Sequence, residues 1–249
     1  MSALKARLAY PDAKSFQSMM ETLSKIVDEA VMTVKDDGVV IRALDPAHVA
    51  MIEINLPPDI FLEYEVEGEA KVGFNVTNIA KIVKRGKKGD KVEIEATDDR
   101  VTWTIAGAAI KRYKLLNLDV PEPEIPQAEF EFKARVALIV DAFKNALRDA
   151  ETVGDTVELE ADEEKLIIRG KGAAIAETEI TRDKPAVIDF QVEEPSRAAY
   201  SIDYLKHVLA LTKVADTVTI EFSSDAPLRL QFSLPAGGRV TYLLAPKAA

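Results

Sequence analysis

The chain has 249 residues, 47% of them hydrophobic, which is enough for one large domain or two domains of ordinary size, each with its own core. It has no cysteine, which excludes disulfide bonds, thiolate zinc sites and cysteine nucleophiles. Its formal net charge is −10, and it has neither an apolar leader nor an apolar run of roughly eighteen residues, so we expect a cytoplasmic protein that does not enter membranes.

Apolar residues at three- and four-residue intervals predict four short helices. In chain order they are expected at Ala13–Asp28, Val76–Lys84, Arg135–Ala150 and Ile202–Thr212. Alternation of period two dominates the remaining segments and predicts strands. Sheet is therefore expected to outweigh helix.

Turn chemistry divides the alternating segments into hairpins. The first half contains VMTVKDDGVVIRAL, with a turn at Asp36-Asp37-Gly38, and VEIEATDDRVTWTI, with a turn at Asp98-Asp99. The second half contains VELEADEEKLIIRG and VTIEFSSDAPLRLQF, and PAGGRV predicts a further turn before the last strand.

The order helix, hairpin, helix, hairpin occurs twice, which indicates an internal duplication. Phe16 corresponds to Phe143, and Met20 corresponds to Leu147. Between the copies lies NLDVPEPEIPQAE, whose prolines forbid a helix and predict an extended, acidic connector. We therefore predict an N-terminal domain at 1–116, a connector at 117–129 and a C-terminal domain at 130–249.

Few residues have the spacing that catalysis requires. The two histidines, His48 and His207, lack metal-ligand spacing, and no nucleophile elbow, Walker loop or dinucleotide-binding turn is present. Paired carboxylates fall in predicted turns, where solvated acids are common. We predict no catalytic residues, no metal and no cofactor. The enzymatic alternative is a metal-assisted hydrolase that uses the acidic turns at Asp36, Asp98 and Asp162.

Basic residues gather on the predicted helices of this acidic chain. The segment KIVKRGKKGDK, residues 81–91, carries Lys81, Lys84 and Arg85 at helical spacing. A solvated helix C-terminus explains this segment alone equally well. Further basic residues lie on the other predicted helices: Lys144, Arg148, Lys206 and Lys213. This recurrence favours a polyanion partner that is contacted at its phosphates, without base reading.

Five separate motifs carry a resemblance to a known family. They are IVDEA (26–30), LDPAHVAMIEINLP (44–57), LDVPEPEIP (118–126), SSDAPLRLQF (223–232) and YLLAPK (242–247). With them, the chain resembles the sliding clamps of the proliferating cell nuclear antigen type, especially archaeal ones, over essentially its whole length. The resemblance implies an α+β, duplicated DNA-clamp fold, with curved antiparallel sheets outside and two helices inside each domain. It also implies a non-enzymatic subunit of a toroidal ring around duplex DNA.

The resemblance assigns three sets of residues. The DNA-facing set on the helices is Lys81, Lys84, Arg85, Lys144, Arg148, Lys206 and Lys213. The groove for partner peptides, beside the connector, is Leu44, His48, Met51, Ile125, Pro227, Leu244, Ala245 and Pro246. The subunit interface pairs basic Lys111, Arg112 and Lys114 with acidic Glu177 and Glu179.

The implied partners are double-stranded DNA and proteins that bind through a short peptide motif. The protein partners comprise DNA polymerase, the clamp loader, flap endonuclease and DNA ligase. Complementary charge on the two edges favours a homotrimer. The alternative is a clamp-like subunit that closes a ring only with different, related subunits. In a prokaryote, such a clamp would be associated with the nucleoid.

Overall fold

The computed structural model describes residues 3–124 and 130–247. These residues divide into two units. The N-terminal unit comprises the chain up to 46, 52–124 and 234–240, and the C-terminal unit comprises 47–51, the described part of 125–233, and the chain from 241. The predicted connector is described only as far as Glu124.

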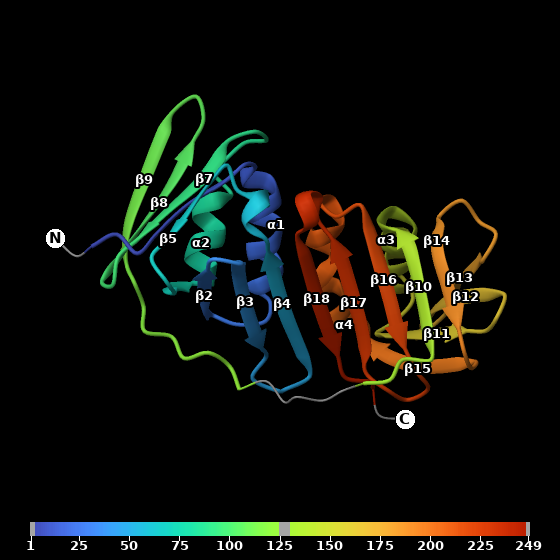
Figure 1. The fold of residues 1–249 in the computed structure, drawn as a ribbon. Helices are drawn as coiled ribbons and strands as arrows, with labels where there is room; N and C mark the ends of the chain where they lie inside the picture. Colours follow the sequence, from blue (N-terminus) through green and yellow to red (C-terminus); the bar gives the residue numbers. More distant parts are fainter. Residues whose placement is uncertain (1–2, 125–129, 248–249) are drawn as a thin grey trace. The chain divides into compact units, whose positions relative to one another are not determined.

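The first half of the chain folds into antiparallel sheets with two α-helices. Its elements are β1 (Ala6–Tyr10), α1 (Ala13–Leu23), β2 (Glu29–Lys35), β3 (Gly38–Leu44), β4 (Ala50–Leu56), the 3-10 helix η1 (Pro58–Ile60), β5 (Glu63–Val66), β6 (Ala70–Asn75), α2 (Val76–Val83), β7 (Lys91–Ala96), β8 (Arg100–Ala106) and β9 (Ile110–Leu116). Neighbouring strands follow the orders β5-β1-β7-β8-β9 and β4-β3-β2-β6. Helices α1 and α2 pack side by side (Figure 1).

The second half repeats this plan. Its elements are β10 (Ala134–Ile139), α3 (Val140–Glu151), β11 (Thr156–Ala161), β12 (Lys165–Lys171), β13 (Ile175–Thr181), β14 (Val187–Val192), β15 (Ser196–Ser201), α4 (Ile202–Leu205), η2 (Lys206–Lys213), β16 (Thr217–Phe222), β17 (Leu228–Ser233), η3 (Pro235–Gly237) and β18 (Arg239–Leu244). The orders β14-β10-β16-β17-β18 and β13-β12-β11-β15 match those of the first half. The predicted duplicated α+β fold is confirmed.

In each unit, an aromatic residue of a helix packs against an aromatic residue of a strand. In the N-terminal unit, Phe16 of α1 lies 6.0 Å from the ring of Trp103, centroid to centroid. In the C-terminal unit, Phe143 of α3 lies 6.3 Å from Phe232 in a T-shaped contact. All four rings are buried, and such pairs stabilise a core beyond their buried area. Each unit therefore has its own hydrophobic core.

The predicted hairpins are present, and their turns explain why they form there. Strands β2 and β3 pair across Asp36-Asp37, and Lys35 stands opposite Gly38. Gly38 has a φ of 138°, and an added Cβ would lie 2.6 Å from the carbonyl oxygen of Leu56. Only glycine fits this turn without strain.

Two predicted helix boundaries were wrong, and one predicted helix is of a different type. The third helix begins at Val140, because Arg135–Ile139 continue β10, which pairs with both β14 and β16. A short apolar run such as VALIV fits a strand as well as a helix. The first helix ends at Leu23, and β2 already begins at Glu29. The fourth is one α-helical turn followed by the 3-10 helix η2. None of the described helices is long and apolar enough to span a membrane.

Candidate nucleic-acid interface and assembly edges

Helix α2 presents the densest basic surface of the N-terminal unit. The side chain of Asn75 caps its first turn by accepting the N–H of Asn78 at 2.9 Å. Its apolar residues turn inward, and Lys81, in its last turn, stays exposed. Lys84 is the C-cap residue and Arg85 follows the helix, both exposed. These cations lie where the helix dipole favours positive charge.

The basic loop after α2 is held in a defined conformation. The backbone N–H of Lys87 donates to the carboxylate of Asp90 at 2.8 Å. Gly89 has a φ of 84°, and its N–H donates to the carboxylate of Asp12 at 2.9 Å. Since Asp12 is also the N-cap of α1, the exposed Lys87 and Lys88 are fixed beside that helix.

Two of the predicted basic residues in the C-terminal unit, Lys144 and Lys206, are engaged by carboxylates. Lys144 of α3 forms an ion pair with Asp141, one turn earlier. Lys206 lies 3.3 Å from Glu151 and 3.4 Å from Asp203, and its hydrogen bonds to these two carboxylates raise its pKa. Lys213, the last residue of η2, is exposed.

Arg148 differs from these lysines. It lies in the last turn of α3, is exposed and makes no ion pair with any described residue. The same holds for Lys81, Lys84 and Arg85. Within the described part of the chain, these four cations are the members of the predicted DNA-facing set that are most available to an external anion.

Two segments of the predicted peptide groove lie side by side in the C-terminal unit. The N–H of Ala245 donates to the carbonyl oxygen of Val49 at 2.8 Å, which fixes the segment after β18 beside the loop of His48. His48 is exposed and adopts a left-handed conformation, with a φ of 56°. The N–H of Lys247 donates to the carbonyl of Ala199 at 2.7 Å, so this segment also borders β15.

The groove candidates differ in exposure. The half-buried ones are Leu44, Met51, Pro227, Ala245 and Pro246. Leu44 ends β3 in the N-terminal unit, whereas the other four lie in the C-terminal unit. The side chain of Leu244 is part of the core, at 1% exposure. Ile125 lies outside the described residues.

Sequence reasoning missed an aromatic pair just after the connector. Phe130 is 40% exposed, and its ring lies 6.2 Å from that of Phe132. The guanidinium of Arg229 sits 4.5 Å from the centroid of Phe132, a cation–π contact. The alternation in FEF, residues 130–132, is the only local signal for this pair, and it directly follows a proline-rich segment.

The basic edge predicted for subunit contacts is strand β9, at one end of its sheet. Because side chains alternate along a strand, Arg112 and Lys114 share one face, whereas Lys111 lies on the other. Lys111 donates to the carbonyl of Arg85 at 3.2 Å. The face of Arg112 and Lys114 also carries Ile110 and Leu116, which are 59% and 64% exposed.

The acidic edge is strand β13, at one end of the four-stranded sheet. Glu177 and Glu179 lie on the same face as Ile175, which is 69% exposed. Both carboxylates already have partners within the unit. Glu177 accepts a hydrogen bond from Arg169 at 2.7 Å, and Glu179 accepts one from Lys165 at 2.8 Å.

The acidic turns have structural partners. Asp162 accepts the N–H groups of Glu164 and Lys165 at 2.8 Å and 3.0 Å, which shapes its own turn. At the Asp98-Asp99 turn, the hydroxyl of Thr97 donates to Asp99 at 2.9 Å. Among the described residues, no group of three or more acidic or histidine side chains could hold a metal ion.

Comparisons with known proteins cover nearly the whole chain. The model for the proliferating cell nuclear antigen N-terminal domain matches residues 4–121, and that for the C-terminal domain matches residues 124–247. A curated relative from Aeropyrum pernix, named DNA polymerase sliding clamp 1, is 38% identical over 94% of this chain and 97% of its own length. The DNA polymerase sliding clamp of Pyrococcus abyssi is 33% identical over 96% and 97%, respectively.

Solved structures are similar as well. Proliferating cell nuclear antigen from Thermococcus kodakaraensis superposes with a TM-score of 0.90 at 29% identity, covering 97% of this chain and all of that one. A chain of the PCNA2–PCNA3 complex from Sulfolobus tokodaii superposes with a TM-score of 0.92 at 26% identity, covering 98% of this chain and all of its own length.

Proposed function

This chain belongs to the proliferating cell nuclear antigen family, and we propose that it is a DNA polymerase sliding clamp that closes as a trimeric ring around duplex DNA. The family resemblance read from the sequence is confirmed by the match of both domain models. The curated relatives carry the name of that function. The work of such a clamp would take place on chromosomal DNA inside the cell.

The observation that carries the proposal is the segregation of charge. Lys81, Lys84, Arg85 and Arg148 are exposed cations on or beside helices, in a chain with a net charge of −10. In our proposal, these helices line the hole of the ring and meet the phosphates. A positive channel in a negative ring attracts DNA to the channel and away from the outside. Contacts with phosphates alone carry no sequence information, so the ring can slide.

Ring closure is proposed to join β9 of one subunit to β13 of the next. Arg112 and Lys114 would meet the face of Glu177 and Glu179, and exposed isoleucines on both strands would be covered. Such a head-to-tail contact is heterologous, and it also protects two open sheet edges. Because one chain carries both edges, we propose a homotrimer.

A heterotrimer is the second candidate, because one structural relative is a PCNA2–PCNA3 complex. In that case, this chain would close a ring only with related but different subunits. The two candidates differ in the behaviour of the purified chain. A homotrimer forms alone, whereas a heterotrimer subunit does not.

Protein partners are proposed to bind where the segment after β18 meets the loop of His48. Polymerase, clamp loader, flap endonuclease and ligase would each insert a short peptide there, and tethering would raise their local concentration on DNA. The half-buried Pro227, Ala245 and Pro246 would form its floor. We add the exposed Phe130 to this surface, because aromatic residues are enriched at protein interfaces.

We propose no catalytic activity. Asp162 uses its carboxylate to form its turn, which is a structural role. A hydrolase that used Asp36, Asp98 or Asp162 would need a divalent ion and would lose turnover when one of them is changed. This remains the weaker alternative.

The test combines solution mass with DNA retention. Light scattering behind a sizing column should give a mass near three times the 27.3 kDa subunit. Once loaded, the ring should stay on a closed circular plasmid through a high-salt wash and slide off after the plasmid is linearised. Equal loss from circular and linear DNA would refute topological retention. A monomer that gains mass only with related subunits would favour the heterotrimer.

A further inference from the structure

The acidic edge of β13 is not free to receive a partner in the isolated subunit. We propose that Lys165 competes, from within the subunit, with the cations of a docking subunit for the carboxylate of Glu179. Ring closure then exchanges one ion pair for another, and Lys165 sets the affinity between subunits. The inference rests on the proposed closure of β9 against β13. It assigns Lys165 an affinity-setting role that differs from that of the neighbouring Arg169.

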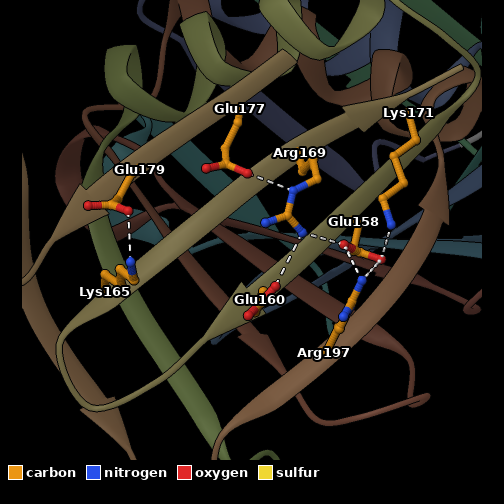
Figure 2. Close-up of polar contacts among 8 residues, drawn as sticks. All are labelled: Glu158, Glu160, Lys165, Arg169, Lys171, Glu177, Glu179 and Arg197. Atoms are coloured by element: carbon orange, nitrogen blue, oxygen red, sulfur yellow. Dashed lines mark hydrogen bonds and ion pairs between the residues drawn. The ribbon is translucent and has the colours of Figure 1, made fainter. Parts of the chain in front are cut away.

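Figure 2 shows the contacts that place Lys165 in this role. Its Nζ lies 2.8 Å from a carboxylate oxygen of Glu179, on the adjacent strand. The lysine side chain is 34% exposed and that of Glu179 is 45% exposed, so the pair lies at the surface where a second subunit would dock. The hydrogen bond and charge of Glu179 raise the pKa of Lys165, so the lysine stays protonated.

Arg169 stands beside this pair but has a different set of contacts. Its guanidinium binds Glu177 at 2.7 Å, Glu158 at 2.5 Å and Glu160 at 3.2 Å (Figure 2). If a docking subunit takes Glu177, Arg169 still keeps two carboxylates. Its side chain is only 17% exposed, so it stays within the sheet. Loss of the contact between Arg169 and Glu177 would therefore cost little free energy, because Arg169 keeps its other two carboxylate partners.

Lys165 has no second carboxylate of this kind. Glu179 is its only ion-pair partner among the described residues. When an incoming cation from β9 takes Glu179, Lys165 either loses its partner or stays close to a like charge. Both outcomes oppose closure.

The basic edge has no matching competitor. Arg112 and Lys114 are exposed, and neither forms an ion pair within the part of the chain that the structure describes. Lys111 is held by a carbonyl on the other face of β9. The free energy lost in the exchange therefore comes from the β13 edge, and most of it is the ion pair between Lys165 and Glu179.

Loss of a charged residue at an interface usually weakens binding, but loss of Lys165 should strengthen it. The size of the effect follows from the strength of a surface ion pair. Removing Lys165 should tighten each interface by about two- to fivefold, the range for exposed pairs. A closed trimer contains three such interfaces, and the half-assembly concentration varies as the inverse square root of the trimer constant. We therefore expect that concentration to fall about three- to tenfold.

The experiment compares the wild-type chain, Lys165→Met and Lys165→Arg by sedimentation velocity over a dilution series. Lys165→Met should assemble at lower concentration and with stronger dependence on salt, because its closure forms an ion pair at Glu179 without breaking one. Lys165→Arg keeps the charge and should behave like wild type. The matched control is Lys133→Met. Lys133 has the same exposure, 34%, and its Nζ lies 3.2 Å from the carboxylate of Glu193, which is not on β13. Thermal unfolding of each monomer shows whether the substitution has altered the fold.

The outcomes separate this inference from the proposed function. Charge reversal with Arg112→Glu and Lys114→Glu should abolish assembly if β9 is an interface edge. Suppose that this charge-reversed variant is monomeric. If Lys165→Met then assembles no more tightly than wild type or the Lys133→Met control, the competitor role is wrong and the clamp assignment stands. If neither the wild type nor Lys165→Met assembles at any concentration, both the competitor role and self-closure fail.

Discussion

Asp12 and Gly89 join the start of α1 to the basic loop that follows α2. One carboxylate oxygen of Asp12 accepts the N–H of Gly89 at 2.9 Å, and the other accepts the N–H of Ser15 at 2.9 Å. Beside them, the N–H of Ala13 donates to the carbonyl of Asp90 at 2.8 Å. One side chain therefore caps a helix and fixes the position of a positively charged loop.

We expect Asp12→Ala to lower the free energy of unfolding by about 1–2 kcal/mol, because a helix cap and a loop anchor are lost together. Urea denaturation measures this loss, and faster hydrogen exchange at the amide of Gly89 reports release of the loop. Asp98→Ala, at an exposed turn, is the control and should change stability by less than about 0.5 kcal/mol. Equal effects of both substitutions would argue against a dual role for Asp12.

Much of this architecture can be predicted from local chemistry. The hairpins follow from turns such as Asp36-Asp37-Gly38, where glycine alone tolerates the backbone conformation. The boundary error at Arg135 has a different origin. The run VALIV, residues 136–140, is apolar without a clear period. Its first four residues form a strand because they pair with β14 and β16, which lie far along the chain.

The candidate site likewise has features that the sequence predicts and features that depend on tertiary contacts. Helical spacing was sufficient to place Lys81 and Lys84 on one exposed surface. It could not reveal that Lys206 contacts Glu151, because that pair joins η2 to the end of α3 through tertiary packing. The same limit applies to β13, where the sequence suggests free acids but the fold has already paired Glu179 with Lys165.

Asn117 should be essential for anchoring the start of the connector. Its side-chain amide donates to the carbonyls of Lys71 and Thr97 at 2.9 Å and 3.0 Å, and its oxygen accepts the N–H of Gly73 at 2.8 Å. We expect Asn117→Ala to destabilise the N-terminal unit by about 2–3 kcal/mol, since it leaves several backbone groups without their partner. Thermal unfolding followed by the fluorescence of Trp103, the only tryptophan, measures this.

A second substitution at Asn117 checks the hydrogen-bond directions. Asn117→Asp keeps the shape but presents an oxygen where the amide donates to two carbonyls. It should therefore be about as damaging as alanine at neutral pH. If aspartate matched the wild-type stability, the assigned donor and acceptor positions would be reversed or irrelevant.

Glu158 should make stability depend on pH in the acid range. Burial alone would raise its pKa, but hydrogen bonds from Lys171, Arg197 and Arg169 dominate and lower the pKa to about 2, from 4.5. Because the folded pKa lies below the unfolded one, the stabilisation is complete above pH 4.5 and is lost as pH falls from 4.5 toward 2. We expect a loss of about 1–3 kcal/mol over that window, allowing for exposure of its partners.

Urea unfolding at a series of pH values compares wild type with Glu158→Gln. The variant should be less stable at pH 7 and should lose less stability on acidification, because its amide does not titrate. Glu163→Gln, at an exposed position in the next turn, should follow the wild-type curve. Parallel curves for Glu158→Gln and wild type would show that the acid sensitivity has another source.

Retention on DNA should depend on the exposed cations of the helices. We expect Lys84→Glu with Arg148→Glu to weaken retention on circular DNA about ten- to a hundredfold at moderate salt, because two phosphate-contacting cations in each subunit become anions. The solution mass should be unchanged, because neither residue lies on β9 or β13. Lys184→Glu with Arg239→Glu makes the same charge change at exposed positions outside every α-helix and is the matched control. Retention equal to that of the control would remove these helices from the DNA-facing surface, whereas a selective loss that diminishes at high salt would support electrostatic contact with the duplex.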